Sequence, residues 1–218
     1  MRQAIRAAEA VAMIPDGASI MIGGFMAVGT PERLVDELVR QQRRDLTIIG
    51  NDTARPGVGV GKLIDAGLVR KVITSHIGTN PVTQRGMIEG RIDIELVPQG
   101  TLAERIRAAG FGLGGVLTPT GVGTLAAEGK RTIEIEGRTF LVEPPLKSDV
   151  ALLRASVADY YGNLVYRLTA ENFNPIMAMA AALVIAEPGE IVPVGSIPPD
   201  EVETPGVLVD YLIGREAA

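Results

Sequence analysis

Glycines are the residues of this sequence whose spacing most clearly suggests chemistry. Gly23, Gly24 and Gly29 lie in one short stretch that follows an apolar run at residues 19–22. Because glycine has no Cβ atom, such a loop can adopt positive φ and can let another molecule approach the backbone closely. Backbone N–H groups in such a loop can bind an anion or stabilise negative charge that develops on oxygen. An ordinary strand-to-helix turn is the alternative, and the pattern alone does not separate the two.

A strand and a helix must position this loop. Residues 19–22 are apolar without polar alternation, which predicts a strand that is covered on both faces. After the loop, Thr30 is expected to cap a helix whose first position is Pro31 and which continues over residues 32–40. The N–H groups and the positive dipole end of that helix would then point toward the glycine loop, an arrangement that suits an anion.

The rest of the chain alternates between strand and helix patterns. Further strands are expected at residues 45–50, 71–75, 92–97, 149–156 and 183–186, and helices at residues 62–66, 82–89, 101–110 and 172–182, with a capping box at 101–104. This alternation predicts an α/β fold, with a mostly parallel open sheet and helices on both faces. Residues 132–142 read as a hairpin around Glu136-Gly137, which adds a small β extension. A single domain over residues 1–218 is the simplest arrangement.

Polar residues follow several of the predicted strands at their carboxyl ends. Asn51 and Asp52 follow one strand, His76 follows the next and Gln99 follows the fourth. In open α/β sheets, ligands bind at the carboxyl edge of the strands. These side chains and the glycine loop are therefore expected to lie along one edge of the sheet.

Composition excludes several classes of function. The chain has 218 residues, a net charge of −5, one histidine and no cysteine. Its charge argues against nucleic acid as the main partner. A single histidine without cysteine cannot supply a typical zinc site, so no metal is expected. No apolar run reaches the roughly 20 residues that span a bilayer, and the first residues lack the pattern of a secretory signal, so no membrane association and a cytoplasmic location are expected.

Two other glycine-rich stretches match nucleotide-binding patterns only in part. Residues 110–115 fit Gly-x-Gly-x-x-Gly, but a predicted helix precedes them and Thr118-Pro119 follow them where a helix is required. Residues 57–62 resemble a P-loop, but Pro56 and Leu63 stand where that loop needs glycine and serine or threonine. The first pattern therefore argues only weakly for a nucleotide site, and the second is rejected as a P-loop.

The glycine stretch, taken with its neighbours, resembles the signature of family I coenzyme A transferases, A (α) subunit. The matching residues are Asp16-Gly17, the apolar residues 20–22, Gly23-Gly24-Phe25, Gly29 and Pro31, followed by segments 51–54, 75–81, 97–102, 112–115, 117–124 and 172–175. The resemblance covers nearly the whole chain and is strongest to the acetate/acetoacetate (3-oxoacid) type. It implies a fold of the CoA-transferase and NagB/RpiA-like kind. These residues do not separate that type from succinyl-CoA:3-oxoacid and 3-oxoadipate enzymes.

The resemblance also implies a division of labour between two chains. In that family a glutamate attacks an acyl-CoA thioester in a ping-pong reaction, and it lies on the B (β) subunit in a Ser-Glu-Asn-Gly context. This chain has no such sequence, so the resemblance implies no catalytic residue in this chain. Glu171 precedes an asparagine, but its predicted place at a helix start indicates a helix-terminal carboxylate. A B-subunit partner in an α2β2 assembly, coenzyme A thioester as substrate and no tightly bound cofactor are expected.

Two sets of residues are expected to bind substrate. The resemblance marks the glycine loop for contact with coenzyme A, namely Gly23, Gly24, Phe25, Met26, Ala27, Val28 and Gly29. Gln99, an uncharged donor at a strand edge, is expected to bind the acyl carboxylate or carbonyl, and Asn51 is a second candidate for that role. The alternative for Gln99 is a side chain that bonds to its own loop backbone.

Two other functions remain open on the sequence. One is a self-sufficient enzyme of similar architecture, such as a sugar-phosphate isomerase, that would use Asp52 or His76 as base. The other is a non-catalytic module that binds coenzyme A or a nucleotide. Isomerase activity of the purified chain alone would favour the first. Tight ligand binding, with no activity gained on adding any partner, would favour the second.

Overall fold

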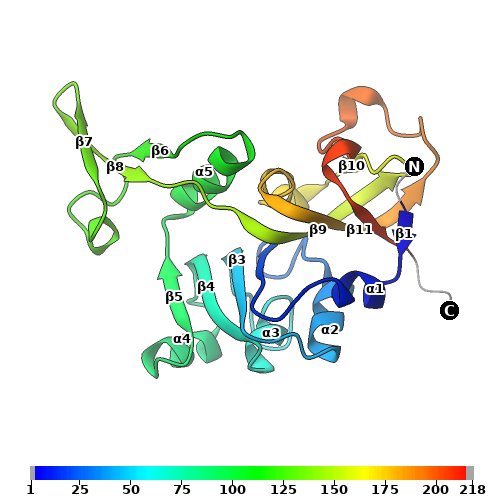
Figure 1. Cartoon of the computed structure of the whole chain (residues 1–218), viewed down its shortest axis with the longest axis horizontal. Helices are drawn as coiled ribbons and strands as arrows, with labels where there is room; N and C mark the ends of the chain where they lie inside the picture. Colours follow the sequence, from blue (N-terminus) through cyan, green and yellow to red (C-terminus); the bar gives the residue numbers. More distant parts are fainter. Residues whose placement is uncertain (1–2, 215–218) are drawn as a thin grey trace.

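One large, mostly parallel sheet organises the computed structural model, which describes residues 3–214 (Figure 1). In spatial order its strands are β1 (Gln3–Ile5), β12 (Tyr211–Ile213), β11 (Ala181–Val192), β9 (Ser148–Asp159), β2 (Ser19–Ile22), β3 (Leu46–Asp52), β4 (Val69–His76) and β5 (Asp93–Leu96). Neighbours along this path are parallel, whereas the short β10 (Leu164–Val165) pairs antiparallel with β9. The predicted open, mostly parallel sheet is confirmed.

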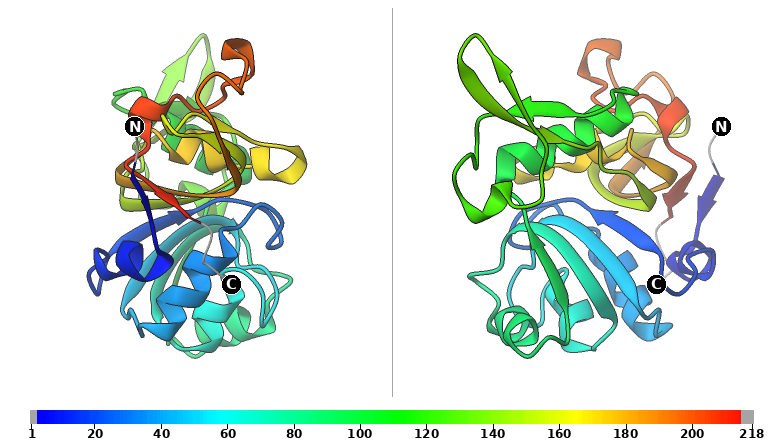
Figure 2. Two further views of the ribbon diagram at one scale, coloured as in Figure 1. Left: turned by 90° about the vertical axis from the view of Figure 1, so that its right-hand side faces the viewer. Right: turned by 60° about the vertical axis from the view of Figure 1, so that its left-hand side comes forward.

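Helices cover both faces of this sheet (Figure 2). They are α1 (Ala7–Ala12), α2 (Glu32–Arg40), α3 (Gly61–Asp65), α4 (Pro81–Ile88), α5 (Gln99–Gly110) and α6 (Asn174–Met177), with short 3₁₀ turns η1 (Leu125–Ala127), η2 (Leu168–Glu171), η3 (Pro199–Glu201) and η4 (Gly206–Leu208). One hydrophobic core joins α1, α2 and α3 to the sheet, and a second joins α5 and α6 to its other face. Within residues 3–214, no helix is both long enough and apolar enough to cross a membrane.

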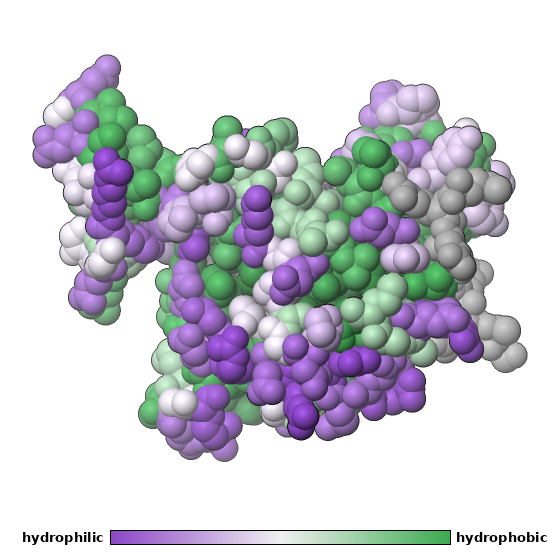
Figure 3. Space-filling view, in the orientation of Figure 1, coloured by the Kyte–Doolittle hydropathy of each residue, from purple (hydrophilic) through white to green (hydrophobic). Residues whose placement is uncertain are grey.

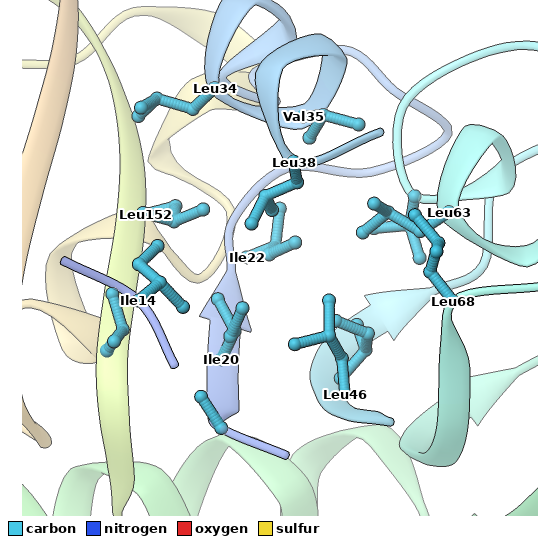
Figure 4. Close-up of a cluster of buried hydrophobic side chains, with 14 of the residues drawn as sticks. Ile14, Ile20, Ile22, Leu34, Val35, Leu38, Leu46, Leu63, Leu68 and Leu152 are labelled. Carbon is cyan, nitrogen blue, oxygen red and sulfur yellow. The ribbon is translucent and has the colours of Figure 1, made fainter. Parts of the chain in front are cut away.

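Strand β2 contributes to both cores, as its unbroken apolar sequence predicts. Ile20 and Ile22 point toward α2, whose Leu34 and Leu38 pack over them (Figure 4), while Met21 faces the core under α5. All five side chains are almost fully buried. Since burial of an aliphatic side chain is worth about 1.5–3 kcal/mol, this packing fixes where β2 ends and hence where the glycine loop begins.

A three-stranded arm projects from the body of the protein (Figure 1). It consists of β6 (Val116–Thr118), β8 (Arg138–Glu143) and β7 (Thr132–Ile135), in that spatial order and antiparallel. The hairpin predicted around Glu136-Gly137 is confirmed, with positive φ at both turn residues, as a type I′ turn requires. The arm leaves apolar side chains such as Leu117 and Ile133 exposed, and green surface covers part of it in Figure 3.

The predicted helix at residues 172–182 is mostly wrong. Helix α6 has only four residues, because Phe173 adopts a left-handed φ of 63° before it, and β11 already begins at Ala181. Strand β11 then continues through Pro188, well beyond the predicted end at residue 186. Strand β12 pairs only with Ile185 and Ala186 of β11, so one edge of β11 is free at Pro188, where a proline can be accommodated.

Both predicted threonine caps are also wrong. Helix α2 is preceded by Pro31, and the hydroxyl of Thr30 instead donates to the Gly23 carbonyl at 3.0 Å. Helix α5 begins at Gln99, directly after Pro98, so Thr101 lies inside its first turn and no side chain caps it. Gln99 is therefore the first helical residue after β5 and not a loop residue.

Candidate functional site

Two of the predicted site residues contact each other at the carboxyl edge of the sheet. The side chain of Asn51, near the end of β3, is 2% exposed, and its Oδ1 accepts hydrogen bonds from Gln99 Nε2 at 2.8 Å and from Ser75 Oγ at 3.0 Å. Gln99 is exposed on the other side. The alternative in which Gln99 bonds to its own loop backbone is not what the structure has. Asn51 instead holds its amide at the surface.

Asn172 connects this pair to the glycine loop. Its Oδ1 accepts from Asn51 Nδ2 at 3.3 Å, and its carbonyl accepts from the Gly24 amide at 3.1 Å. A continuous set of hydrogen bonds thus runs from Gln99 through Asn51 and Asn172 to Gly24. Asn172 is not among the site residues predicted from the sequence, although it lies in the segment 172–175 that carries part of the family resemblance.

The glycine loop contains a tight turn whose two central residues are not glycines. Phe25 and Val28 exchange both backbone hydrogen bonds at 2.9 Å, and between them Met26 and Ala27 have φ of 51° and 71°. Two successive positive φ values define a type I′ turn, which usually takes asparagine or glycine. Phe25 is 42% and Val28 is 57% exposed. The loop therefore presents two apolar side chains to solvent in a strained backbone conformation.

Most amides of this loop are already used inside the chain. Gly23 donates to the Leu152 carbonyl, Gly24 to that of Asn172, and Met26 to the Asp52 carboxylate, while Phe25 and Val28 bond to each other. Among residues 3–214, the amides of Ala27 and Gly29 have no such partner. The expectation of a loop whose amides are open to an oxyanion is therefore wrong for five of its seven residues.

The loop glycines are needed for close packing against the chain itself. A Cβ atom on Gly23 would lie 2.0 Å from Asn174 Oδ1, one on Gly24 would lie 2.7 Å from the Val28 carbonyl oxygen, and one on Gly29 would lie 2.6 Å from Ala170 Cα. Separations under 3 Å cannot be tolerated without movement. The loop glycines therefore pack tightly against other segments of the chain, and within the loop residues 25–29 keep exposed or partly exposed surface.

A buried carboxylate occupies the N-terminus of helix α2. Glu187 of β11 is 3% exposed; its Oε2 accepts from the Leu34 amide at 3.1 Å, and its Oε1 lies 3.4 Å from both Arg33 Nε and Arg154 Nη1. The dipole end that we expected to face an anionic ligand is therefore satisfied by an internal anion. Burial raises the pKa of the Glu187 carboxyl above its ordinary value, and the hydrogen bond from Leu34 and the two arginines offset this only in part.

Replacement of Glu187 by glutamine should change how stability depends on pH. In the folded protein the carboxyl keeps its proton to higher pH than in the unfolded chain, so wild type should lose stability relative to Glu187→Gln as pH rises from its ordinary pKa of 4.5 through the raised pKa. Above that window the difference should stay constant. Urea unfolding of both proteins between about pH 4 and pH 7 measures this. If the free energies of unfolding of the two proteins changed in parallel with pH across this window, the raised pKa of Glu187 would be contradicted.

The remaining titratable candidates do not assemble into a catalytic group. Asp52 is buried, and both of its oxygens accept backbone amides, from Ala54 at 2.6 Å and from Met26 at 2.9 Å. His76 is the neighbour of Asp52 in the pairing of β3 with β4 and is exposed. Glu171 ends the turn η2 and is exposed. Within residues 3–214, no three acidic or histidine side chains lie close enough to hold a metal ion. The engagement of Asp52 disfavours its use as a free base.

A cavity of about 570 Å³ opens beside the helix that carries Gln99. It lies between α5 and β6, and residues that line it include Gly100, Glu104, Arg107 and Leu117. Volumes of 300–1,000 Å³ are typical of small-ligand pockets. Since Gly100 directly follows Gln99, the cavity extends to the first turn of α5 that carries Gln99.

Comparison with known proteins gives concordant matches. Residues 4–214 match the family model described as Coenzyme A transferase. The chain is 55% identical to the acetate CoA-transferase subunit alpha of Escherichia coli K12, over 94% of this chain and 93% of that protein. It is 50% identical to the acetoacetyl-CoA:acetate/butyrate CoA transferase alpha subunit of Clostridium acetobutylicum, over 93% of each. The structure of an acyl-CoA transferase from Escherichia coli O157:H7 superposes with a TM-score of 0.86 at 23% identity, covering 98% of this chain and 47% of that longer chain.

Proposed function

Because this chain belongs to the coenzyme A transferase family, we propose that it is the A (α) subunit of an acetate or 3-oxoacid CoA-transferase. The enzyme would move coenzyme A between acetyl-CoA or succinyl-CoA and a carboxylate such as acetoacetate, acetate or another 3-oxoacid. The observation that carries this proposal is the 55% identity, over 94% of the chain, to a protein named as such a subunit. We also propose a cytoplasmic location.

The proposed reaction is ping-pong and uses a glutamate of the partner subunit. The glutamate oxygen attacks the thioester carbonyl, the C–S bond breaks, and coenzyme A leaves as thiolate. The thiolate then attacks the glutamyl carbonyl of the acyl-glutamyl anhydride, which releases the first carboxylate and leaves a glutamyl-CoA thioester. A second carboxylate displaces coenzyme A by the same steps in reverse order. The reaction needs no metal ion and no tightly bound cofactor.

This chain would supply binding groups to that site. Gln99 Nε2 would bind the acyl carboxylate or carbonyl oxygen, and Asn51, which is 2% exposed and accepts from Gln99 Nε2 at 2.8 Å, would hold it in position. The exposed side chains of Phe25 and Val28 would contact coenzyme A, together with the partly exposed Met26, Ala27 and Gly29, whereas Gly23 and Gly24 are buried beneath them. The amides of Ala27 and Gly29 are the loop donors left for an oxyanion.

We infer a partner subunit because, within residues 3–214, the carboxylates nearest the glycine loop and the strand ends are poorly suited as nucleophiles. The carboxylate at the end of β3, Asp52, is bonded to two backbone amides, and Glu171 lies in an exposed 3₁₀ turn. The relatives named above are subunits by name, which supports a B (β) subunit as partner. We propose an α2β2 assembly.

Co-expression with a homologous B subunit tests the proposal directly. The chain alone should show neither transferase nor isomerase activity, whereas the co-purified complex should transfer coenzyme A between acetyl-CoA and acetoacetate. Borohydride or hydroxylamine trapping of the glutamyl-CoA intermediate, followed by mass determination of each chain, should place the modification on the B subunit. Modification of this chain, or isomerase activity without a partner, would overturn the assignment.

Replacement of Gln99 by alanine should weaken binding of the acyl carboxylate. We expect KM for the carboxylate acceptor to rise about tenfold, which corresponds to the loss of about 1.4 kcal/mol from one hydrogen bond to a charged group. The KM for the acyl-CoA thioester should change less, because Gln99 is proposed to bind the acyl group and not the pantetheine or nucleotide portions. Steady-state kinetics of the complex with both substrates varied gives both constants.

Gln41 provides a matched control for this variant. Its Nε2 also donates to other groups of the chain, the Ala8 carbonyl and Glu37, but it lies at the C-terminal end of α2, away from the carboxyl edge of the sheet. Gln41→Ala should leave both KM values unchanged. Unaltered kinetics of Gln99→Ala with every carboxylate tried would remove Gln99 from the site.

A further inference from the structure

Asp52 links the end of strand β3 to the glycine loop, because each of its two carboxylate oxygens accepts a hydrogen bond from a backbone amide. The residue is 6% exposed. Its Oδ1 accepts from the Ala54 amide at 2.6 Å, and its Oδ2 accepts from the Met26 amide at 2.9 Å. The first bond shapes the turn that follows β3, and the second crosses to a different segment of chain. The side chain therefore fixes one backbone segment relative to the other.

The segment that Asp52 holds is strained. Met26 and Ala27 both adopt positive φ, a conformation that costs non-glycine residues energy and persists only where the surroundings enforce it. The cavity between Asp52 and this turn measures only about 10 Å³, which leaves space for one water at most. No ligand can enter beneath the turn, so Asp52 acts there as a support. The opposite side of the turn carries the exposed Phe25 and Val28.

We propose that Asp52 is a positioning residue that holds the Met26–Ala27 turn in its left-handed conformation and thereby aims Phe25 and Val28 at the coenzyme A thioester. A carboxylate is required because both oxygens accept from N–H groups. An asparagine could satisfy one amide, but its own NH₂ group would face the other. The kinetic consequence rests on the function proposed above, whereas the conformational consequence does not.

The conformational consequence is tested on this chain by itself. In Asp52→Asn, hydrogen exchange of the Met26 amide, followed by NMR, should accelerate at least tenfold, with smaller changes at Ala54. Asp149→Asn is the matched control. Asp149 also accepts two hydrogen bonds, from the amide and the hydroxyl of Ser19, but at the opposite end of β2. It should leave exchange at Met26 unchanged. Unchanged exchange at Met26 in Asp52→Asn would overturn the inference, whether or not the chain is a transferase subunit.

The kinetic consequence is tested in the complex with the B subunit. Asp52→Asn should lower kcat/KM for acyl-CoA at least tenfold and leave kcat/KM for the carboxylate acceptor near that of wild type, whereas loss of folded protein would lower kcat/KM for both substrates by the same factor. A second change, Ala27→Gly, should restore most of the lost rate, because glycine adopts positive φ without strain. Failure of that rescue would show that Asp52 acts through Ala54 and not through the turn. A wild-type complex without transferase activity would instead refute the proposed function alone.

Discussion

Replacement of Gly24 by alanine is expected to lower transfer of coenzyme A by the assembled enzyme roughly 100-fold, while the chain still folds. Gly24 has φ of 98°, and a Cβ atom there would lie 2.7 Å from the Gly29 carbonyl carbon, Thr30 Oγ1 and the Val28 carbonyl oxygen. Two of these atoms belong to the backbone and cannot rotate away. The loop must therefore rearrange, at a cost of about 1–3 kcal/mol, and Phe25 and Val28 move with it.

Gly17→Ala separates the effect of the clash from that of backbone strain. Gly17 has a comparable φ of 78°, but a Cβ atom there would meet no atom within 4 Å. Alanine at that position should cost about 1 kcal/mol of stability and leave transferase activity per folded molecule unchanged. Thermal unfolding and steady-state kinetics of both variants give the comparison. Equal losses of activity in the two variants would mean that the loop around Gly24 has no special role.

Local sequence determines the strand, the loop and the helix that form the core of the site. Strand β2 has the bounds that the apolar run at 19–22 predicts, and helix α2 covers residues 32–40 and begins one residue after the predicted start at Pro31. Both patterns reflect burial against neighbouring elements. In a chain of alternating strands and helices, the spacing of apolar residues along the sequence is enough to indicate which side chains are buried. The placement of Asn51 and Gln99 at one edge was predictable for the same reason, because parallel strands bring their carboxyl ends together.

Contacts between distant segments were not predictable from the sequence. The Asp52 carboxylate reaches Met26, Glu187 reaches Leu34 across 153 positions of sequence, and Asn172 reaches Gly24. The carboxylates of Asp52 and Glu187 and the backbone carbonyl of Asn172 each accept from an amide that the sequence pattern assigned to a ligand. A glycine loop followed by a helix indicates available N–H groups, but whether the fold itself consumes them depends on which side chains the topology brings there.

The segment that closes on the loop was also mispredicted for a physical reason. Residues 172–182 are predicted as one helix, but a left-handed residue precedes the helix and the pairing of β11 with β9 from Ala181 onward ends the segment. Phe173 is held at positive φ, and the Asn174 side chain is required for the loop. Positive φ at a non-glycine residue is costly and has no sequence pattern of its own, so the misprediction coincides with a site that serves the loop.

Asn174 should be the most sensitive side chain of that segment. It is fully buried; its Nδ2 donates to the Gly29 and Ala170 carbonyls at 3.0 and 2.8 Å, and its Oδ1 accepts from the Arg154 amide at 3.0 Å. Loss of three buried hydrogen bonds in Asn174→Ala should lower the free energy of unfolding by about 3 kcal/mol. The same change should release the Gly29 end of the loop and lower transferase activity.

Asn80→Ala is the matched control for loop-specific effects. Asn80 is equally buried and also makes three hydrogen bonds, to the Thr53 carbonyl and from the Val82 and Thr83 amides at the start of α4. Its removal should cost a similar amount of stability. Activity per folded molecule should stay near that of wild type, because none of these bonds reaches the loop.

A double-mutant cycle with Gly23 tests the contact itself. Gly23→Ala should be strongly destabilising on its own, because the new Cβ atom would lie 2.0 Å from Asn174 Oδ1. In the Asn174→Ala background that atom is gone, so the second change should cost little. The two changes should therefore be non-additive by more than about 2 kcal/mol, measured by urea unfolding of all four proteins. If the losses of unfolding free energy were additive, Gly23 would be required for some reason other than the packing of the Asn174 side chain against it.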